Sequence, residues 1–337
     1  MDGFRGLAVL AVLVFHNYRV PLGWVGVDLF FVLSGFLITR ILLVSKARSD
    51  YFRSFYVRRA LRIFPVYYLL LLVAYCVDPA VGHRVWWFAA YLSDFTPLFP
   101  DMAVRALHHT WSLAVEEQFY LLWPLLIWVC PGRWLSAVCV ALLVLVELTR
   151  VCAVPLGASV AFVNYNIATR CDGLLVGAWL AAQVVHGVRP NPGNIRVSRA
   201  VLAGALLVIA ALIATRKFSV SQNPNVWMQG LGMWAVAFGA CAAVWLGMAG
   251  EVGRFGYAVL QFKPLVYVGR ISYGLYLWHQ PILIWAKERF FEPSSLREHL
   301  LLGTSVSVVS LLVAMLSFRY FEAPILSLRR ARQTAPG

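Results

Sequence analysis

The sequence predicts an all-α membrane protein, a polytopic bundle of about ten transmembrane helices. Three observations support this prediction. Hydrophobic side chains make up 61% of the 337 residues and charged side chains 13%, with a mean hydropathy of +0.74, so the charges are too few to cover a soluble globule of this size. Apolar runs long enough to cross about 30 Å of hydrocarbon recur along the whole chain. Basic residues gather in the short breaks between these runs.

Each expected span is an apolar run of about 17–25 residues, bounded by Gly, Pro or Arg. The runs lie near 5–20, 22–42, 62–78, 111–130, 135–152, 170–187, 200–215, 227–248, 265–286 and 300–320. The shorter stretch from Val85 to Leu98 ends in TPLFP, which is typical of a re-entrant or interfacial piece. Residues 1–322 are expected to form the transmembrane domain, and 323–337 a basic cytoplasmic tail.

The distribution of Lys and Arg predicts the orientation. The connection between the second and third spans contains Arg40, Lys46, Arg48, Arg53, Arg58, Arg59 and Arg62, which indicates a cytoplasmic loop. With ten spans, both termini then lie in the cytoplasm. The net charge of +14 is spread over helix ends and short loops, which favours contact with membrane lipid over nucleic-acid binding.

Ionisable side chains inside the apolar runs are candidate functional groups, because each costs about 3 kcal/mol or more to insert. Arg5 and His16 are eleven positions apart on the first span, so they lie close to one helix face and are separated by about 16 Å of rise. Asp28 begins the second span. It either orients the His16 imidazole or stabilises the start of its own helix.

Three arginines stand where the third span leaves the cytoplasm. Arg59 and Arg62 share one helix face, with Arg58 beside them. Guanidinium groups in this arrangement suit a phosphate-bearing ligand. The same positions also suit an ordinary cytoplasmic anchor.

Polar residues follow one face of the fourth span. Ser112, Glu116 and Tyr120 are spaced i, i+4, i+8, which favours Glu116 over Glu117 as the inward-facing acid. Trp111 and Tyr120 are either cavity residues or aromatics of the membrane interface.

Two later spans carry further polar residues. Arg170 and Asp172 lie on nearly opposite faces of one helix, so we expect each to pair with another helix. Ser272, Tyr276 and His279 form a polar seam at i, i+4 and i+7 on the ninth span.

Several of these stretches, in this order, resemble the acyltransferase-3 family of bacterial integral membrane acyltransferases. They are MDGFRGLAVLAVLVFH, GVDLFFVLSGFLITR, RRALRIFPVYYL, HTWSLAVEEQFYLLWPLL, RCDGLLVG and ISYGLYLWHQPIL. The resemblance extends from Asp2 to about Glu322. It implies transfer of an acyl group, usually acetyl from acetyl-CoA, to a hydroxyl of a sugar or similar acceptor. Some family members carry a C-terminal SGNH hydrolase-like domain, and none is expected here.

The family motifs can be placed residue by residue. They fall on Arg5 with His16, on Arg59 with Arg62, on Ser34, Gly35 and Phe36, and on Glu116. Together with the residue chemistry, they give one hypothesis. His16 acts as general base, with Glu116 or Asp28 stabilising its imidazolium, or is itself acylated. The arginines hold CoA, and Ser34 or a backbone amide near Gly35 serves the thioester oxyanion.

The resulting prediction is an acyl-CoA-dependent O-acyltransferase of the bacterial inner membrane, with several membrane passes. Its partners would be acyl-CoA, membrane lipid and a surface glycan such as lipopolysaccharide O-antigen or another exopolysaccharide. Neither a metal nor nucleic acid is expected. The alternatives are a small-molecule acceptor such as a macrolide, a lipid-linked sugar acylated at the cytoplasmic side, or transport of a glycolipid.

Overall fold

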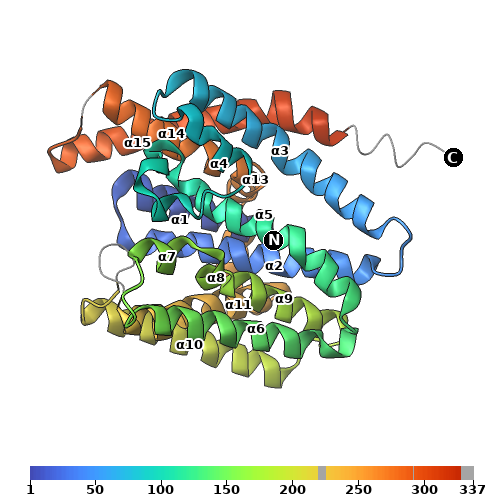
Figure 1. The fold of residues 1–337 in the computed structure, drawn as a ribbon. Helices are drawn as coiled ribbons and strands as arrows, with labels where there is room; N and C mark the ends of the chain where they lie inside the picture. The colour runs from blue at the N-terminus through green and yellow to red at the C-terminus, as the bar shows by residue number, and fades with distance from the viewer. Residues whose placement is uncertain (219–224, 291, 328–337) are drawn as a thin grey trace.

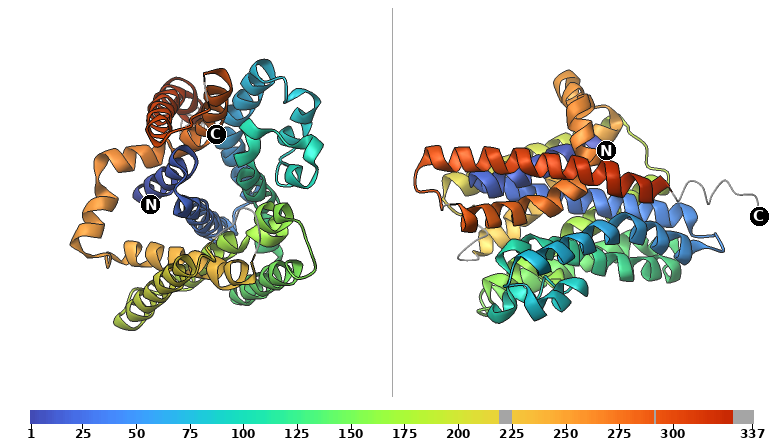
Figure 2. Two further views of the ribbon diagram at one scale, coloured as in Figure 1. Left: turned by 90° about the vertical axis from the view of Figure 1, so that its left-hand side faces the viewer. Right: turned by 90° about the horizontal axis from the view of Figure 1, so that it is seen from above.

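The structure is a computed structural model that describes residues 1–218, 225–290 and 292–327. Its long helices run side by side, and shorter helices cross them or cover their ends (Figures 1 and 2). The regular structure of the described residues is helical throughout, which confirms the predicted all-α class.

Among the described residues, six helical segments are long and apolar enough to cross a membrane. They are Pro21–Ser45, Tyr51–Val77, Gly132–Ala153, Pro192–Ala214, Met228–Ala249 and Leu296–Ser327. The other predicted spans also contain helices, namely α1 (Asp2–Tyr18), α5 (Trp111–Val129), α9 (Asp172–Val185) and α14 (Ser272–Arg289). The chain is therefore a multi-pass membrane protein.

A helical hairpin forms the centre of the bundle. Helix α1 ends at Tyr18, and the positive φ of 56° at Arg19 stops the helix. The 3₁₀ turn η1 (Pro21–Trp24) then leads into α2 (Val25–Ser45). Pro21 suits the first position of η1, because proline has no N–H to leave unpaired there.

Two groups of helices flank this hairpin (Figure 1). One group contains α6 (Gly132–Ala153), α9, α10 (Pro192–Ala214) and α11 (Met233–Ala249), the last preceded by the π-helical turn η6 (Met228–Gly232). The other contains α3 (Tyr51–Val77), α5, α14 and α15 (Leu296–Ser317), the last followed by the π-helical turn η7 (Phe318–Glu322). Because α1 packs on α14 and α2 packs on α9, the hairpin joins the two groups.

Glycines allow α2 and α9 to approach closely. A Cβ on Gly35 would lie 1.9 Å from the carbonyl oxygen of Leu174, and one on Gly177 would lie 2.1 Å from the carbonyl oxygen of Val32. No side chain fits at such distances, so backbone meets backbone. This contact fixes the depth of α2, and hence of Ser34 and Asp28.

Replacing Gly35 with alanine is expected to destabilise the protein by about 1–3 kcal/mol, because the new methyl group forces α2 and α9 apart. Thermal unfolding in lipid nanodiscs measures the effect. Gly204→Ala is the matched control, since Gly204 lies within helix α10 with no atom within 4 Å of the built Cβ. Equal melting temperatures for the two variants would contradict the packing argument.

Helix α3 begins at Tyr51, well before its predicted span near 62–78. The additional turns are rich in Arg. The Tyr51 and Tyr56 hydroxyls donate to the carbonyl oxygens of Pro124 (3.1 Å) and Leu121 (2.8 Å) on α5. Packing of these aromatic side chains on α5 extends the helix beyond the apolar run. A hydropathy window misses this, because it averages aromatics with arginines.

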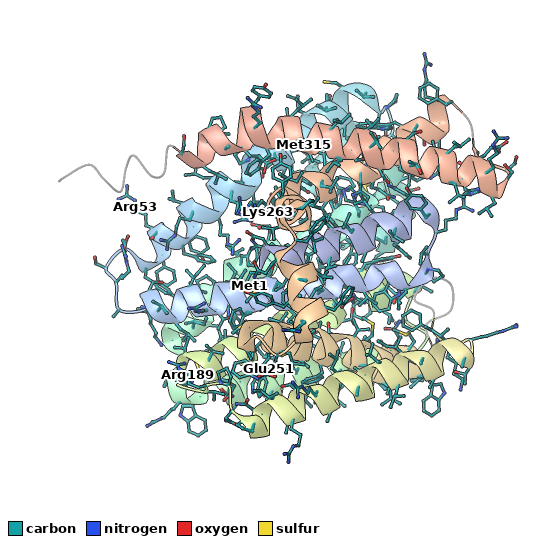
Figure 3. All side chains as sticks on the ribbon, turned by 180° about the vertical axis from the view of Figure 1, so that it is seen from behind. Met1, Arg53, Arg189, Glu251, Lys263 and Met315 are labelled. Carbon is teal, nitrogen blue, oxygen red and sulfur yellow. The ribbon has the colours of Figure 1, made fainter. Side chains whose placement is uncertain are left out.

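The predicted single span at 265–286 is wrong, because the chain changes direction between α13 (Lys263–Arg270) and α14. Helices α12 (Gly253–Gln261) and α13 cross the back of the bundle, near Lys263 and Met1 in Figure 3. A Cβ on Gly269 would lie 1.9 Å from the carbonyl oxygen of Asp2. This close packing of α13 on α1 sets the turn, and the apolar run does not signal it.

The remaining connections are built of short helices. Between α3 and α5 lie η2 (Gly82–Arg84), α4 (Val85–Ala89), η3 (Thr96–Leu98), η4 (Pro100–Met102) and η5 (Arg105–Thr110). Between α6 and α9 lie α7 (Val160–Tyr165) and α8 (Ile167–Arg170). The predicted re-entrant stretch 85–98 thus holds helices too short to span. At the other end, helix continues to Ser327, and positions 328–337 of the predicted tail lie outside the described residues.

Candidate active site

Three neighbouring cavities lie along the α1–α2 hairpin. The inner mouth, on the side of the α2–α3 connection, has a volume of about 360 Å³ and is lined by Arg5, Arg58, Arg59 and Arg62 with apolar residues. The central cavity, of about 80 Å³, shares Arg5, Arg59 and Arg62 with it. The outer cavity, of about 250 Å³, lies on the side of η1 and shares Val27 and Tyr276 with the central cavity.

The inner mouth gathers the arginines predicted from the sequence. Arg5 comes from α1, and Arg58, Arg59 and Arg62 come from the first half of α3. None of the ion pairs between described residues involves Arg59 or Arg62, and the Arg59 guanidinium instead lies 4.7 Å from the centroid of the Tyr120 ring. The mouth is therefore a cationic site suited to an anionic ligand.

The central cavity contains acidic and hydroxyl side chains. Ser34 from α2 and Glu116, Glu117 and Tyr120 from α5 line it. The Glu116 carboxylate lies beside the Ser34 and Tyr120 hydroxyls, and its Oε1 atom is buried without a hydrogen-bond partner among the described residues. The predicted polar stripe of α5 thus faces the cavity, although Glu117 faces it as well.

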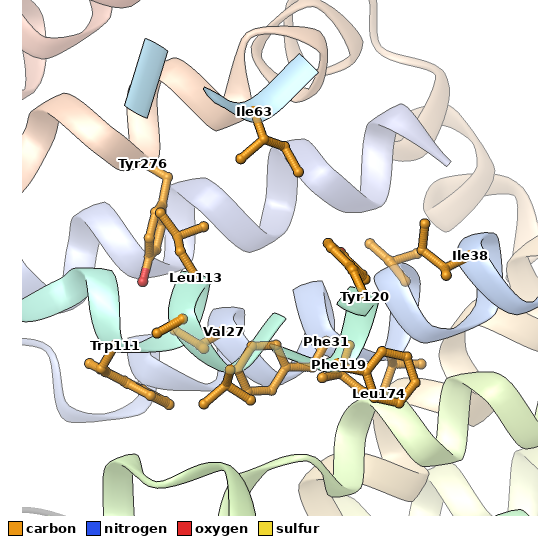
Figure 4. Packing of buried hydrophobic residues seen from close by; sticks show 14 of the residues in the cluster. Val27, Phe31, Ile38, Ile63, Trp111, Leu113, Phe119, Tyr120, Leu174 and Tyr276 are labelled. Carbon is orange, nitrogen blue, oxygen red and sulfur yellow. The ribbon is translucent and has the colours of Figure 1, made fainter. Parts of the chain in front are cut away.

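Tyr276 lies between the central and outer cavities, with Val27 and Trp111 close by in Figure 4. Its hydroxyl donates to the carbonyl oxygen of His109 (2.9 Å) and lies 2.5 Å from the Ser112 hydroxyl. The Ser112 hydroxyl also lies 3.2 Å from the same His109 carbonyl oxygen, so the three groups form one hydrogen-bonded cluster. Two hydrogen bonds thus hold Tyr276 across the boundary.

Histidines line the outer cavity. His16 lines it together with His108 and His109, and His279 is fully buried behind His16. Burial lowers the pKa of His108, and burial together with the charges of His279 and His16 lowers that of His109. Both residues belong to η5, outside the spanning helices, and both favour the neutral form. Neither histidine was predicted as a site residue, although HHTW stands at the start of the fourth span.

Two hydrogen bonds determine which nitrogen of His16 carries hydrogen. His279 Nδ1 lies 2.6 Å from the carbonyl oxygen of Tyr276, and a carbonyl only accepts, so Nδ1 donates. His279 Nε2 then presents a lone pair, which accepts from His16 Nδ1 at 3.0 Å. The Nε2 atom of neutral His16 is therefore unprotonated and able to accept a proton.

Comparison with known proteins identifies the family of the chain. The model of the acyltransferase-3 family, described as an acyltransferase domain, matches residues 1–319. The chain belongs to the acyltransferase-3 family. The match includes every residue of the three cavities described above.

Curated relatives of this acyltransferase-3 chain include enzymes of cell-wall glycans. It is 32% identical to the peptidoglycan O-acetyltransferase OatA of Listeria monocytogenes, over 96% of this chain and 55% of the relative. It is 26% identical to the O-acetyltransferase OatA of Staphylococcus aureus, over 96% of this chain and 56% of the relative. The chain thus spans about half the length of these relatives. No solved structure matches it.

In this acyltransferase-3 chain Asp28 pairs with Arg170 and not with His16. Arg170 Nη2 donates to both Asp28 carboxylate oxygens, at 3.0 and 3.1 Å, and both side chains are buried. The residue that orients the His16 imidazole is His279. Arg170 comes from the end of α8, so the pair also ties α2 to the segment before α9.

A second buried ion pair holds Asp172. Arg170 and Asp172 do not share one helix as predicted, because α8 ends at Arg170 and α9 begins at Asp172, but each pairs with another helix as expected. The partner of Asp172 is Arg150 of α6, whose Nη1 donates to Asp172 Oδ2 at 2.7 Å and to the carbonyl oxygen of Thr169 at 2.8 Å. Arg150 also contacts Glu147 and is fully buried. Sequence analysis missed Arg150, although it is the last charge within the apolar run 135–152.

Of the remaining predicted residues, some line a cavity and others pack between helices. Trp111 lines the outer cavity and Tyr120 the central one, so neither belongs to an interfacial belt. Ser34 faces the central cavity, but Gly35 faces the α9 backbone. The Gly35 N–H lies mid-helix, where the preceding turn uses it, so the predicted oxyanion role does not suit this amide.

Proposed function

We propose that this protein is an acyl-CoA-dependent O-acyltransferase that crosses the bacterial inner membrane about ten times, with both termini in the cytoplasm. The observation that carries the proposal is the line of cavities from the arginine mouth to His16, whose Nε2 is free to accept a proton. A glycan hydroxyl is the proposed acceptor. Peptidoglycan is tested first, because a relative bears that name.

The donor occupies the inner mouth and the central cavity. Arg58, Arg59 and Arg62 hold the CoA phosphates, and the pantetheine arm passes Arg5 toward His16. The rise of about 16 Å between Arg5 and His16 is comparable with an extended arm. Because Tyr276 is held across the boundary of the outer cavity, the arm reaches His16 only when this side chain moves.

The reaction is a direct transfer. The acceptor hydroxyl oxygen attacks the thioester carbonyl carbon while its proton passes to His16 Nε2. The bond from carbon to sulfur breaks, and the CoA thiolate leaves and takes up the proton from His16 Nε2, which restores the neutral imidazole. Glu116 stabilises the positive charge that develops on the His16 imidazole. The Ser34 hydroxyl donates a hydrogen bond to the oxyanion that forms from the thioester carbonyl.

Inverted membrane vesicles test the proposal. Vesicles holding the wild-type protein or His16→Ala are supplied with radiolabelled acetyl-CoA, and free CoA and labelled glycan are measured. His16-dependent CoA release is expected, which places the donor site on the cytoplasmic face. The assay is repeated with longer acyl-CoA donors. CoA release that never exceeds the level of vesicles without the protein would contradict the proposal and favour glycolipid transport.

Arg59→Gln is expected to raise the KM for acetyl-CoA about 10-fold or more with a small change in kcat, because a charge-assisted hydrogen bond is worth about 1.5–3 kcal/mol. Steady-state kinetics in nanodiscs measure both constants. Arg53→Gln is the matched control, since Arg53 is exposed on the same helix and does not line the mouth. An equal rise in KM for the two variants would contradict phosphate binding by the inner mouth.

A further inference from the structure

The outer cavity contains three buried polar atoms without hydrogen-bond partners among the described residues. They are Arg170 Nε, His109 Nδ1 and Gln280 Oε1. All three residues line this cavity, and each is at least nine-tenths buried. Buried polar atoms are nearly always paired in folded proteins, so these atoms define what a ligand of the cavity must offer.

Each open atom has a definite role. Arg170 Nε carries a hydrogen and can only donate. His109 Nε2 lies 3.1 Å from the carbonyl oxygen of Leu277, which only accepts, so Nε2 donates and Nδ1 is left as an acceptor. Gln280 Oε1 is also an acceptor. A matching ligand therefore supplies one acceptor and two donors.

The charge of the outer cavity is balanced without a ligand. Its arginine, Arg170, is already neutralised by Asp28, and the pKa of His108 is lowered by burial, which keeps that side chain neutral. An anionic ligand would meet two acceptor atoms and no unpaired arginine. An apolar ligand would leave all three polar atoms unpaired. Both classes are thus disfavoured.

The walls of the cavity are aromatic. Trp24, Trp111 and Tyr165 line it, and the Trp111 and Tyr165 rings lie 5.2 Å apart by their centroids. The Arg170 guanidinium lies 5.4 Å from the Trp111 ring and 5.9 Å from the Trp24 ring. The volume of about 250 Å³ lies below the range of about 300 to 1,000 Å³ that is usual for ligand sites. This is room for one ring rather than an oligomer.

We propose that the outer cavity binds one uncharged sugar unit, with its ring against the aromatic walls and its hydroxyls on Arg170, His109 and Gln280. This inference rests on the proposed function, since it assigns the acceptor site of that reaction. Hydroxyl groups both donate and accept, so the hydroxyls of one ring can pair with all three atoms. A further hydroxyl of the same ring then faces His16 Nε2.

Two simple glycosides test the charge preference. Methyl glucoside and methyl glucuronide differ only in carrying CH₂OH or a carboxylate at C6. Binding of each to the purified protein in nanodiscs is measured by saturation-transfer NMR, which needs no turnover. We expect the glucoside to bind at least 10-fold more tightly than the glucuronide. Equal binding, or tighter binding of the glucuronide, would overturn the proposal.

A single substitution tests the site itself. Gln280→Leu keeps the size of the side chain and removes the open acceptor, so it is expected to weaken glucoside binding at least 10-fold and leave the KM for acetyl-CoA unchanged. Gln183→Leu is the matched control, because Gln183 lies in a separate groove between α9 and α10. Glucoside binding that is unaffected by Gln280→Leu overturns the inference even when His16-dependent CoA release continues. Selective, Gln280-dependent binding without CoA release would sustain the sugar site and reject the transferase.

Discussion

His16→Gln is expected to lower kcat for CoA release by about 10²–10⁴-fold, the usual contribution of a general base. Glutamine has a similar size and can form hydrogen bonds, but it cannot accept a proton at neutral pH. The Kd for acetyl-CoA should stay within about 2-fold of wild type, since His16 lines the outer cavity and not the inner mouth. Turnover with radiolabelled acetyl-CoA and equilibrium dialysis of CoA measure the two effects.

The control for this variant is His83→Gln, because His83 is exposed in the connection between α3 and α5. It should behave as wild type in both assays. Full activity of His16→Gln would remove His16 from the chemistry. A large loss of CoA binding in the same variant would instead show that the histidine belongs to the donor site, and the division of the cavities into donor and acceptor parts would be wrong.

His279→Leu is expected to lower kcat on the order of 10²-fold, although His279 does not reach the outer cavity. Leucine cannot accept from His16 Nδ1–H, so this hydrogen bond no longer favours hydrogen on Nδ1, and the imidazole can place its hydrogen on Nε2. In that tautomer Nε2 cannot take the acceptor's proton. KM values for both substrates should change little, because the substitution alters the state of the base rather than a binding contact.

His279→Gln distinguishes a positioning role from a merely structural one. The side-chain oxygen of glutamine can lie near the former Nε2 and accept from His16 Nδ1–H, so we expect at least about 10-fold recovery relative to leucine. Thermal unfolding of both variants should be similar. Equal activity of the glutamine and leucine variants, at equal stability, would show that the hydrogen bond from His16 to His279 does not set the tautomer.

Much of the fold follows from composition and local pattern. Apolar runs predict helices wherever the chain must satisfy its backbone inside a lipid bilayer, and each predicted span holds a helix. The errors are at boundaries that packing decides. Helix α3 starts early because Tyr51 and Tyr56 bond to α5, and the first part of the run 265–286 forms a separate helix because Gly269 packs on Asp2.

The site was predictable in its parts but not in its pairings. Arg5, His16, Arg59 and Glu116 are conspicuous because a charge or imidazole in an apolar run needs a reason. Their sequence spacing also places each on a helix face. Spacing on one helix, however, carries no information about the residue that faces it from another helix. Asp28 therefore seemed a partner for His16, whereas the structure gives it Arg170.

The sequence by itself determined the membrane class, the approximate positions of the helices and many of the side chains that face inward, because these depend on short-range periodicity and on the cost of burying charge. Only the tertiary structure decided that His279 orients His16, 263 positions away, and that Arg170 neutralises Asp28, 142 positions away. Such pairs depend on how deep each helix lies relative to its neighbours. That depth is set by close backbone contacts such as Gly35 on Leu174.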